Sequence, residues 1–117
     1  MSCKSISLGE LESLLRRDLE ECSEKLEAFF AQVRITPVKW RQSPWGVEGF
    51  WAVAVNGDQV LWYNDIEDGF NVSRFVIRGE IPDDEYWCNQ DSLKWALPRL
   101  AGDPGVRLGP PEAIPDP

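Results

Sequence analysis

The chain has 117 residues, 43% of them hydrophobic, which is enough for a single globular domain with its own core. Its 20 acidic and 12 basic residues give a net charge of −8, which argues against nucleic acid or an anionic membrane as a partner and favours a basic protein. It has no histidine, which excludes Ser-His-Asp and Cys-His catalysis in their usual form and zinc sites that use histidine.

The three cysteines, Cys3, Cys22 and Cys88, are too few and too scattered for a four-cysteine metal site or a disulfide framework. No apolar leader opens the chain, and no apolar run is long enough to span a bilayer. These features predict a cytoplasmic protein with free thiols and no cofactor. We expect Cys22 and Cys88 to be buried structural residues, because the acidic neighbours of Cys88 disfavour its thiolate.

The first element is predicted as one long amphipathic helix over residues 8–33. Ser7 and Glu10 have the spacing of a capping box at its start. One apolar stripe then recurs at steps of three and four residues. Its members are Leu8, Leu11, Leu15, Leu19, Cys22, Leu26, Phe29 and Val33. We expect the stripe to cover a sheet, and the heptad-like steps leave a coiled-coil dimer as the alternative.

After residue 37 the pattern changes to alternation, which predicts a four-stranded antiparallel meander. The expected strands are 38–42, 47–55, 59–64 and 70–81, separated by turns rich in Gly, Asn, Asp and Pro. On the last strand, Arg74 and Arg78 alternate with valines and suit a charged edge.

The two central strands have apolar side chains on both faces. Period-two alternation places Trp51, Val53, Val55, Val60 and Trp62 on one face, and Phe50, Ala52, Ala54, Leu61 and Tyr63 on the other. One helix covers only one face. The sequence therefore predicts either a second helix over the other face or an aromatic surface left for a partner.

Residues 81–97 are predicted as the second, shorter helix. Pro82 followed by three acidic residues suits a helix start, Asp91 offers a restart, and Pro98 predicts an end or kink at Leu97. Five of the nine prolines follow in 103–117, which predicts an extended tail. We thus expect one α+β domain at residues 1–102 and a Pro/Gly-rich C-terminal tail at 103–117.

The acidic loop after residue 64 is the main candidate site. Asp65, Glu67 and Asp68 precede Gly69, as in an EF-hand, but Ile66 and Phe75 would occupy ligand positions, so that motif fails. A solvated hairpin loop, a looser divalent-ion site and a patch for a basic partner stay open.

Two other groups of residues bear on partner binding. Asp83, Asp84 and Glu85 can join the acidic loop in space if the fold brings them together. Among the six tryptophans, we expect Trp40, Trp51 and Trp95 in the core. Trp45, in a Ser-Pro-Trp-Gly turn, is a candidate binding anchor.

The function predicted from these features is non-enzymatic binding of a basic protein partner, of which a toxin-neutralising immunity protein or inhibitor is one form. The composition is similar to that of small acidic bacterial proteins that bind another protein. The expected contact residues are Asp65, Glu67, Asp68, Asp83, Asp84 and Trp45. Two alternatives remain: an assembly protein that forms a homodimer through its first helix or a sheet edge, and a small carboxylate-dependent hydrolase.

Overall fold

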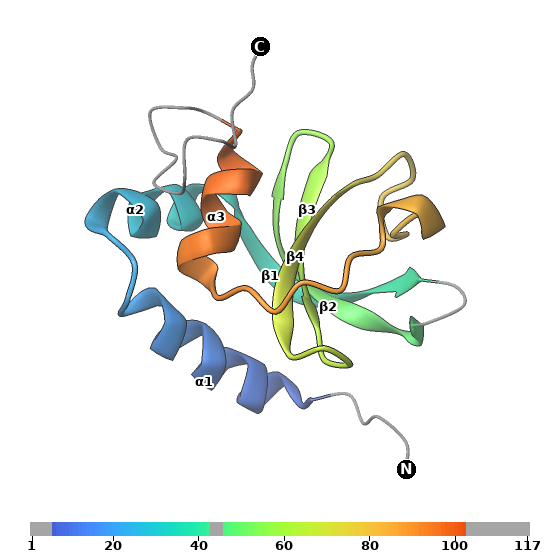
Figure 1. The fold of residues 1–117 in the computed structure, drawn as a ribbon, viewed down its shortest axis with the longest axis horizontal. Coiled ribbons are helices and arrows are strands. Elements are labelled where there is room, and N and C mark those ends of the chain that lie inside the picture. Colours follow the sequence, from blue (N-terminus) through green and yellow to red (C-terminus); the bar gives the residue numbers. More distant parts are fainter. Residues whose placement is uncertain (1–5, 43–45, 103–117) are drawn as a thin grey trace.

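The structure, a computed structural model, describes residues 6–42 and 46–102. In these ranges the elements are α1 (Leu8–Leu19), α2 (Glu24–Val33), β1 (Arg34–Gln42), β2 (Gly46–Asn56), β3 (Gln59–Asn64), β4 (Gly69–Arg74), the short 3-10 helix η1 (Asp83–Glu85) and α3 (Leu93–Ala101) (Figure 1). The strands form one antiparallel sheet in the order β1-β2-β3-β4, which confirms the α+β class and the meander. Trp45 and the expected tail lie outside the described residues.

Two helices replace the single N-terminal helix that the apolar stripe predicted. The capping box of Ser7 and Glu10 is present at the start of α1. The chain leaves the helix after Leu19, and the hydroxyl of Ser23 then accepts a hydrogen bond of 3.1 Å from the Leu26 N–H, so it caps α2. The prediction is therefore wrong between α1 and α2, because a new N-cap interrupts a stripe that continues through it.

A bulge in β2 changes which central side chains share a face. Val55 pairs with Val60 and Ala54 with Leu61, but Ala52 pairs with Trp62, so Val53 is the extra residue. The predicted faces are correct for Ala54 and Val55, but the prediction for Val53 is wrong, since it packs with Ala54 and Leu61 and not with Val55. Before the bulge they are exchanged: Phe50 and Ala52 join the face of Val55, Val60 and Trp62, while Trp51 joins the face of Ala54, Leu61 and Tyr63.

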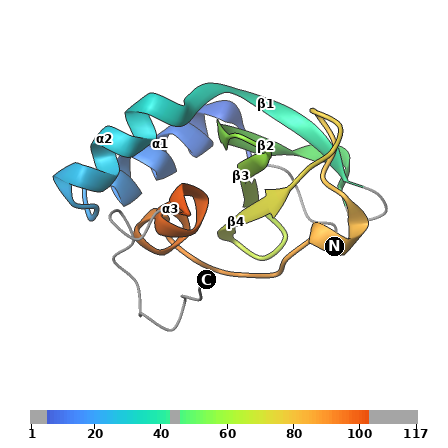
Figure 2. The same cartoon turned by 90° about the horizontal axis from the view of Figure 1, so that it is seen from above.

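All three α-helices cover one face of the sheet, here called the first face, which carries Ala54 and Leu61 (Figure 2). The opposite face, which carries Val60 and Trp62, is the second face. The buried residues Leu11, Leu15, Leu26 and Phe30 of α1 and α2 belong to the same core as the sheet residues Val53 and Leu61, and the leucines of α3 complete that core. The stripe of the first two helices thus covers the sheet, as the sequence predicted.

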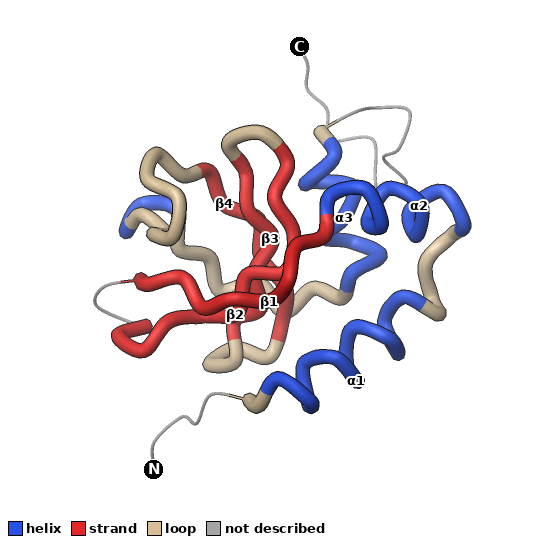
Figure 3. The backbone as a smooth tube through the Cα atoms, turned by 180° about the vertical axis from the view of Figure 1, so that it is seen from behind, coloured by secondary structure: helices blue, strands red, loops and turns tan. Residues whose placement is uncertain are grey.

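The second face is covered by residues 75–92, here called the strap, and not by a helix (Figure 3). Ile81 and Tyr86 of the strap belong to the same hydrophobic cluster as Trp62, and the ring centroids of Tyr86 and Trp62 lie 5.7 Å apart. The predicted helix over 81–97 is therefore wrong before Leu93, apart from the short turn η1. The predicted fourth strand is also too long, since β4 ends at Arg74.

Helix α3 continues to Ala101, through the buried ring of Pro98. Of the two outcomes expected at Leu97, the helix end is therefore wrong, and the kink stays a prediction. Buried residues recur on α3 at Leu93, Ala96, Leu97 and Leu100, which is one helical face. Trp95 lies on the opposite side and is 46% exposed, so its predicted place in the core is wrong.

The strap pairs with both edges of the sheet. On the β1 side, the Arg41 N–H donates to the Gly79 carbonyl and the Ile81 N–H to the Arg41 carbonyl, each at 2.9 Å. On the β4 side, the Phe70 N–H donates to the Asp91 carbonyl at 2.8 Å. The chain therefore crosses the second face from the β1 edge to the β4 edge before it enters α3.

Candidate functional site

The acidic β3–β4 loop is built on one buried side chain, Asn64. Its Oδ1 accepts hydrogen bonds from the backbone N–H groups of Ile66 at 3.0 Å and Glu67 at 3.2 Å. Its Nδ2 donates to the Tyr86 hydroxyl at 3.1 Å and to the Trp87 carbonyl at 3.0 Å. Because Asn64 is fully buried and bonded on both sides, it fixes the loop and the strap to each other.

Asp65 anchors the chain that leads into α1. Its Oδ2 accepts a hydrogen bond of 3.1 Å from the Ile6 N–H, and the Ile6 carbonyl accepts one of 2.9 Å from the Trp51 indole. Partial burial raises the pKa of the Asp65 carboxyl above 3.8, and the Ile6 N–H acts in the opposite direction. A raised pKa suits a general acid, but here the carboxylate already serves as a backbone anchor.

Glu67 and Asp68 complete the loop. Asp68 is exposed and has a φ of 61°, a conformation that Asp tolerates better than most residues. The Tyr63 hydroxyl donates to its carboxylate at the long distance of 3.5 Å. Burial and the charge of Asp68 raise the pKa of Tyr63 to about 12.

Asp83 and Asp84 do not join this loop. They lie in η1, where the Gln42 side chain donates a hydrogen bond of 3.0 Å to Asp83. Figure 1 places η1 beside the ends of β1 and β2, whereas the β3–β4 loop lies next to the start of α1. The acidic residues therefore form two separate surfaces, and the larger single patch that the sequence left open is not present.

The carboxylates of the two surfaces are not in ion pairs within the described ranges. The salt bridges there join Arg41 to Glu80, Lys94 to Glu21 and Arg99 to Asp91. Among residues 6–42 and 46–102, no group of three or more cysteine, aspartate and glutamate side chains is arranged to hold a metal ion.

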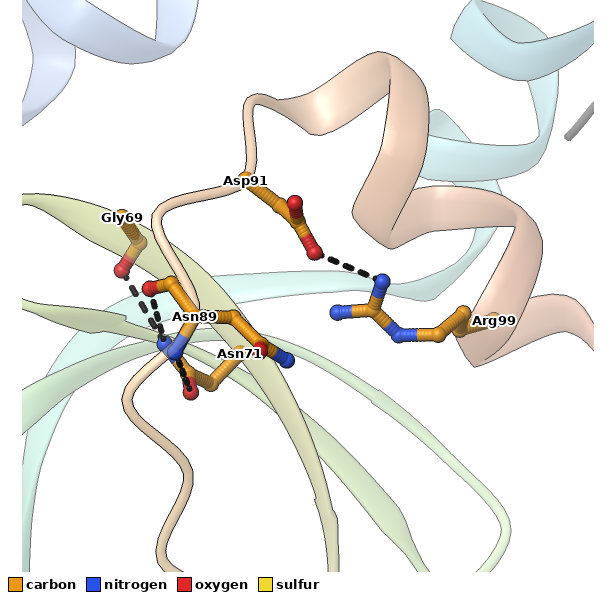
Figure 4. A network of polar contacts seen from close by, with 5 residues as sticks. All are labelled: Gly69, Asn71, Asn89, Asp91 and Arg99. Carbon is orange, nitrogen blue, oxygen red and sulfur yellow. Dashed lines mark hydrogen bonds and ion pairs between the residues drawn. The ribbon is translucent and has the colours of Figure 1, made fainter.

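Four buried polar side chains of the sheet bind the strap at every second residue. Gln42 donates to the Asp83 carboxylate, Ser73 to the Glu85 carbonyl, Asn64 to the Trp87 carbonyl and Asn71 to the Asn89 carbonyl. Each of the four is at most 1% exposed. Figure 4 shows the Asn71 contacts, which include the Asn89 N–H as donor to Asn71 Oδ1 at 3.3 Å.

Sequence reasoning missed these four residues. For three of them, Asn64, Asn71 and Ser73, the available signal was polar side chains at positions of β3 and β4 that share a face with the apolar Val60 and Trp62. A buried polar side chain needs a partner, and here the partner is the backbone of an extended segment.

The path of the strap leaves an open groove of about 440 Å³ along β4. Its lining comes from β3, β4, the strap and α3, and consists of Gln59, Val72, Ser73, Arg74, Glu85, Trp87, Asn89 and Arg99. Trp87 is 41% exposed there. Figure 4 shows the Arg99 side chain extending from α3 toward Asp91, with 2.7 Å between the guanidinium and the carboxylate.

The remaining predicted residues divide between core and surface. Trp40 is buried as expected, and Trp51 is partly buried, with the Lys39 ammonium 5.1 Å from its ring centroid. Cys22 is partly buried, and burial raises the pKa of its thiol to about 11. Cys88 is exposed on the strap, so its predicted burial is wrong.

In comparisons with known proteins, no family model, curated protein or solved structure matches the chain. Within the described part of the chain, no helix has the length and apolar character needed to cross a bilayer.

Proposed function

We propose that the chain is a non-enzymatic binding protein that docks a basic protein partner through the β3–β4 loop, as an immunity or inhibitor protein does. The observation that carries the proposal is the support of this loop by Asn64, which holds the backbone of Ile66 and Glu67 from below. A loop that is already fixed in the free protein costs little entropy to order on binding.

The charge of the chain supports the same proposal. A net charge of −8 attracts a basic partner from a distance and accelerates its association. Glu67 and Asp68 engage no cation within the described ranges, so binding a partner would not require an internal ion pair to break. In this proposal Asp83 and Asp84 form a second contact surface, and Trp45 keeps its role as a predicted anchor.

The test is association kinetics with a partner captured on the immobilised full chain from its native cell. Glu67→Gln and Asp68→Asn remove charge while keeping shape, and Asn also tolerates the φ of residue 68. We expect the double variant to slow association roughly ten-fold at low salt, with the difference shrinking as ionic strength rises.

Asp58→Asn is the matched control. Asp58 is exposed in the β2–β3 turn, at the opposite end of these strands from the β3–β4 loop (Figure 1), and its substitution removes one negative charge, as each member of the double variant does. The proposed surface is contradicted if the association rate changes neither with salt nor in the double variant, or if Asp58→Asn slows association as much as the double variant does.

A homodimer through the β1 edge is the second candidate. The strap pairs with β1 only around Arg41, and Val38 in the remaining part of that edge is 48% exposed. The alternative dimer through the first helix is less favoured, because its apolar stripe lies in the core. The edge dimer would be supported if the mass from light scattering falls on dilution of the wild-type protein and is already that of a monomer in undiluted Val38→Lys.

A further inference from the structure

The outer edge of β4 has one residue, Val72, whose outward N–H has no partner among the described hydrogen bonds. In an antiparallel ladder, the N–H and C=O groups of alternate residues point to opposite sides. The N–H groups of Phe70 and Arg74 point away from β3, since they donate to the Asp91 carbonyl and the Glu85 carboxylate. Val72 lies midway between them and therefore also directs its N–H and C=O outward.

The strap satisfies the edge on both sides of Val72 but not at Val72 itself. At one end it meets Phe70 through Asp91, and at the other it meets Arg74 through Glu85. Between these contacts it bends over the second face, where Asn64 and Asn71 hold it. The open groove lies in this gap, with Val72 in its lining.

The side chains around the gap favour an anion next to an extended backbone. Two guanidinium groups, those of Arg74 and Arg99, line the groove with one carboxylate, that of Glu85, in a chain whose overall charge is −8. The Glu85 carboxylate already accepts a hydrogen bond from the Arg74 N–H. Arg99 is bound to Asp91 at 2.7 Å, but this pair is partly exposed and competes only weakly with another carboxylate. The half-exposed Trp87 ring offers an apolar contact on the same lining.

We propose that this groove binds the C-terminal end of an extended peptide. The peptide backbone would pair with the N–H and C=O of Val72, and its terminal carboxylate would pair with Arg99 and Arg74. A chain end fits better than a continuous segment, because the strap blocks the edge at both Phe70 and Arg74. The groove would bind a negatively charged chain end, whereas the acidic loop would bind a basic protein, so the groove is a second binding surface.

The experiment uses the full chain and a pool of N-acetylated pentapeptides of random sequence, prepared with either a free or an amidated C-terminus. We expect retention of the free-carboxylate pool and loss of binding on amidation. For the retained peptides, Arg99→Gln should weaken binding about ten-fold, because a charge-assisted hydrogen bond is lost. Asp91→Asn should strengthen it about two- to five-fold, because Arg99 is released.

Amide hydrogen exchange then tests the backbone pairing. The Val72 N–H should exchange fast in the free protein and become protected with peptide, whereas the Phe70 N–H is protected in both states. For the peptide-binding measurement, the matched control of Arg99→Gln is Arg78→Gln, which removes an exposed arginine outside the groove lining and should leave binding unchanged.

Equal retention of both pools, equal binding by Arg99→Gln, or a Val72 N–H that is already protected without peptide would each overturn the proposal. Glu67→Gln with Asp68→Asn should leave peptide binding unchanged, so failure here and failure of the acidic surface are separable.

Discussion

Gly69 at the start of β4 lies directly against the backbone of Gln90 in the strap. A Cβ at position 69 would be 2.2 Å from the Gln90 Cα and 2.5 Å from the Asn89 carbonyl oxygen. The requirement for glycine is therefore the close approach of another backbone and not an unusual φ. It also explains why the acidic loop ends at this residue, since the strap crosses the edge immediately beside it.

Gly69→Ala should displace the strap. Because the obstructing atoms are backbone, they move only if the contacts of Asn71 with Asn89 also break, and we expect a loss of about 3 kcal/mol in the free energy of unfolding. Urea denaturation measures the loss. Gly9→Ala is the control: a Cβ there meets nothing closer than 4.0 Å, and alanine in α1 should stabilise by about 0.5–1 kcal/mol.

Asn64→Asp should separate the two roles of this side chain. A carboxylate still accepts from Ile66 and Glu67 but has no proton to donate to the Trp87 carbonyl, so a buried charge faces an acceptor. We expect destabilisation of about 3 kcal/mol by urea denaturation.

The same chemical change at an exposed site provides the comparison for Asn64. The side chain of Asn89 is on the surface, and the contacts of that residue use its backbone, so Asn89→Asp should stay within about 0.5 kcal/mol of wild type. Equal losses in the two variants would show that burial at Asn64 does not matter.

Ser23→Ala tests the break between α1 and α2. The variant loses the hydroxyl that accepts from the Leu26 N–H, and we expect a loss of about 1 kcal/mol in the free energy of unfolding. Ser23→Asp keeps a capping oxygen and should remain close to wild type. If alanine were neutral or stabilising, a continuous helix through this position would describe the chain better than two capped ones.

Stability should fall at alkaline pH because of Tyr63. Burial and Asp68 raise the pKa of its hydroxyl from 10.0 to about 12, so between these values the unfolded chain loses the proton while the folded chain retains it. The unfolded state then binds fewer protons, and the free energy of unfolding decreases as pH rises through this window.

Tyr63→Phe should reduce this alkaline loss, and Asp68→Asn should lower the pKa of Tyr63 itself. Tyrosinate absorbance during a pH titration follows the ionisation, and urea denaturation along the same series follows the stability. An unchanged titration in Asp68→Asn would contradict the influence of that carboxylate.

Local patterns were sufficient for much of the fold. The capping box at Ser7, the alternation in 59–64 and the Asn-Gly-Asp sequence at 56–58 predict the start of α1, the whole of β3 and the central hairpin. Each of these signals depends on residues a few positions apart, and the sequence contains all of that information.

The errors arise where a distant contact or a single extra residue decides the structure. The bulge at Val53 reverses the face of every earlier β2 residue, although the alternation itself looks regular. The acids after Pro82 resemble a helix start, but Ser73 and Asn64 bind the carbonyls of Glu85 and Trp87 and hold this segment extended. Alternation and capping rules do not include such partners.

The candidate site was predictable to a similar extent. The acidic composition of the β3–β4 loop is visible in the sequence, whereas its separation from Asp83 and Asp84 depends on the route of the strap. The groove beside Val72 had no local signal, because Trp87, Arg74 and Arg99 come from three different elements.

The double attachment of the strap has a consequence for the order of folding. The strand hairpins join near neighbours in sequence, whereas the contact between Arg41 and Glu80 closes a separation of 39 residues. Loop closure of this kind follows local pairing, so the meander should assemble first and the strap last. Until that final step both borders of the sheet stay open to other chains, and aggregation during refolding should therefore rise steeply with concentration.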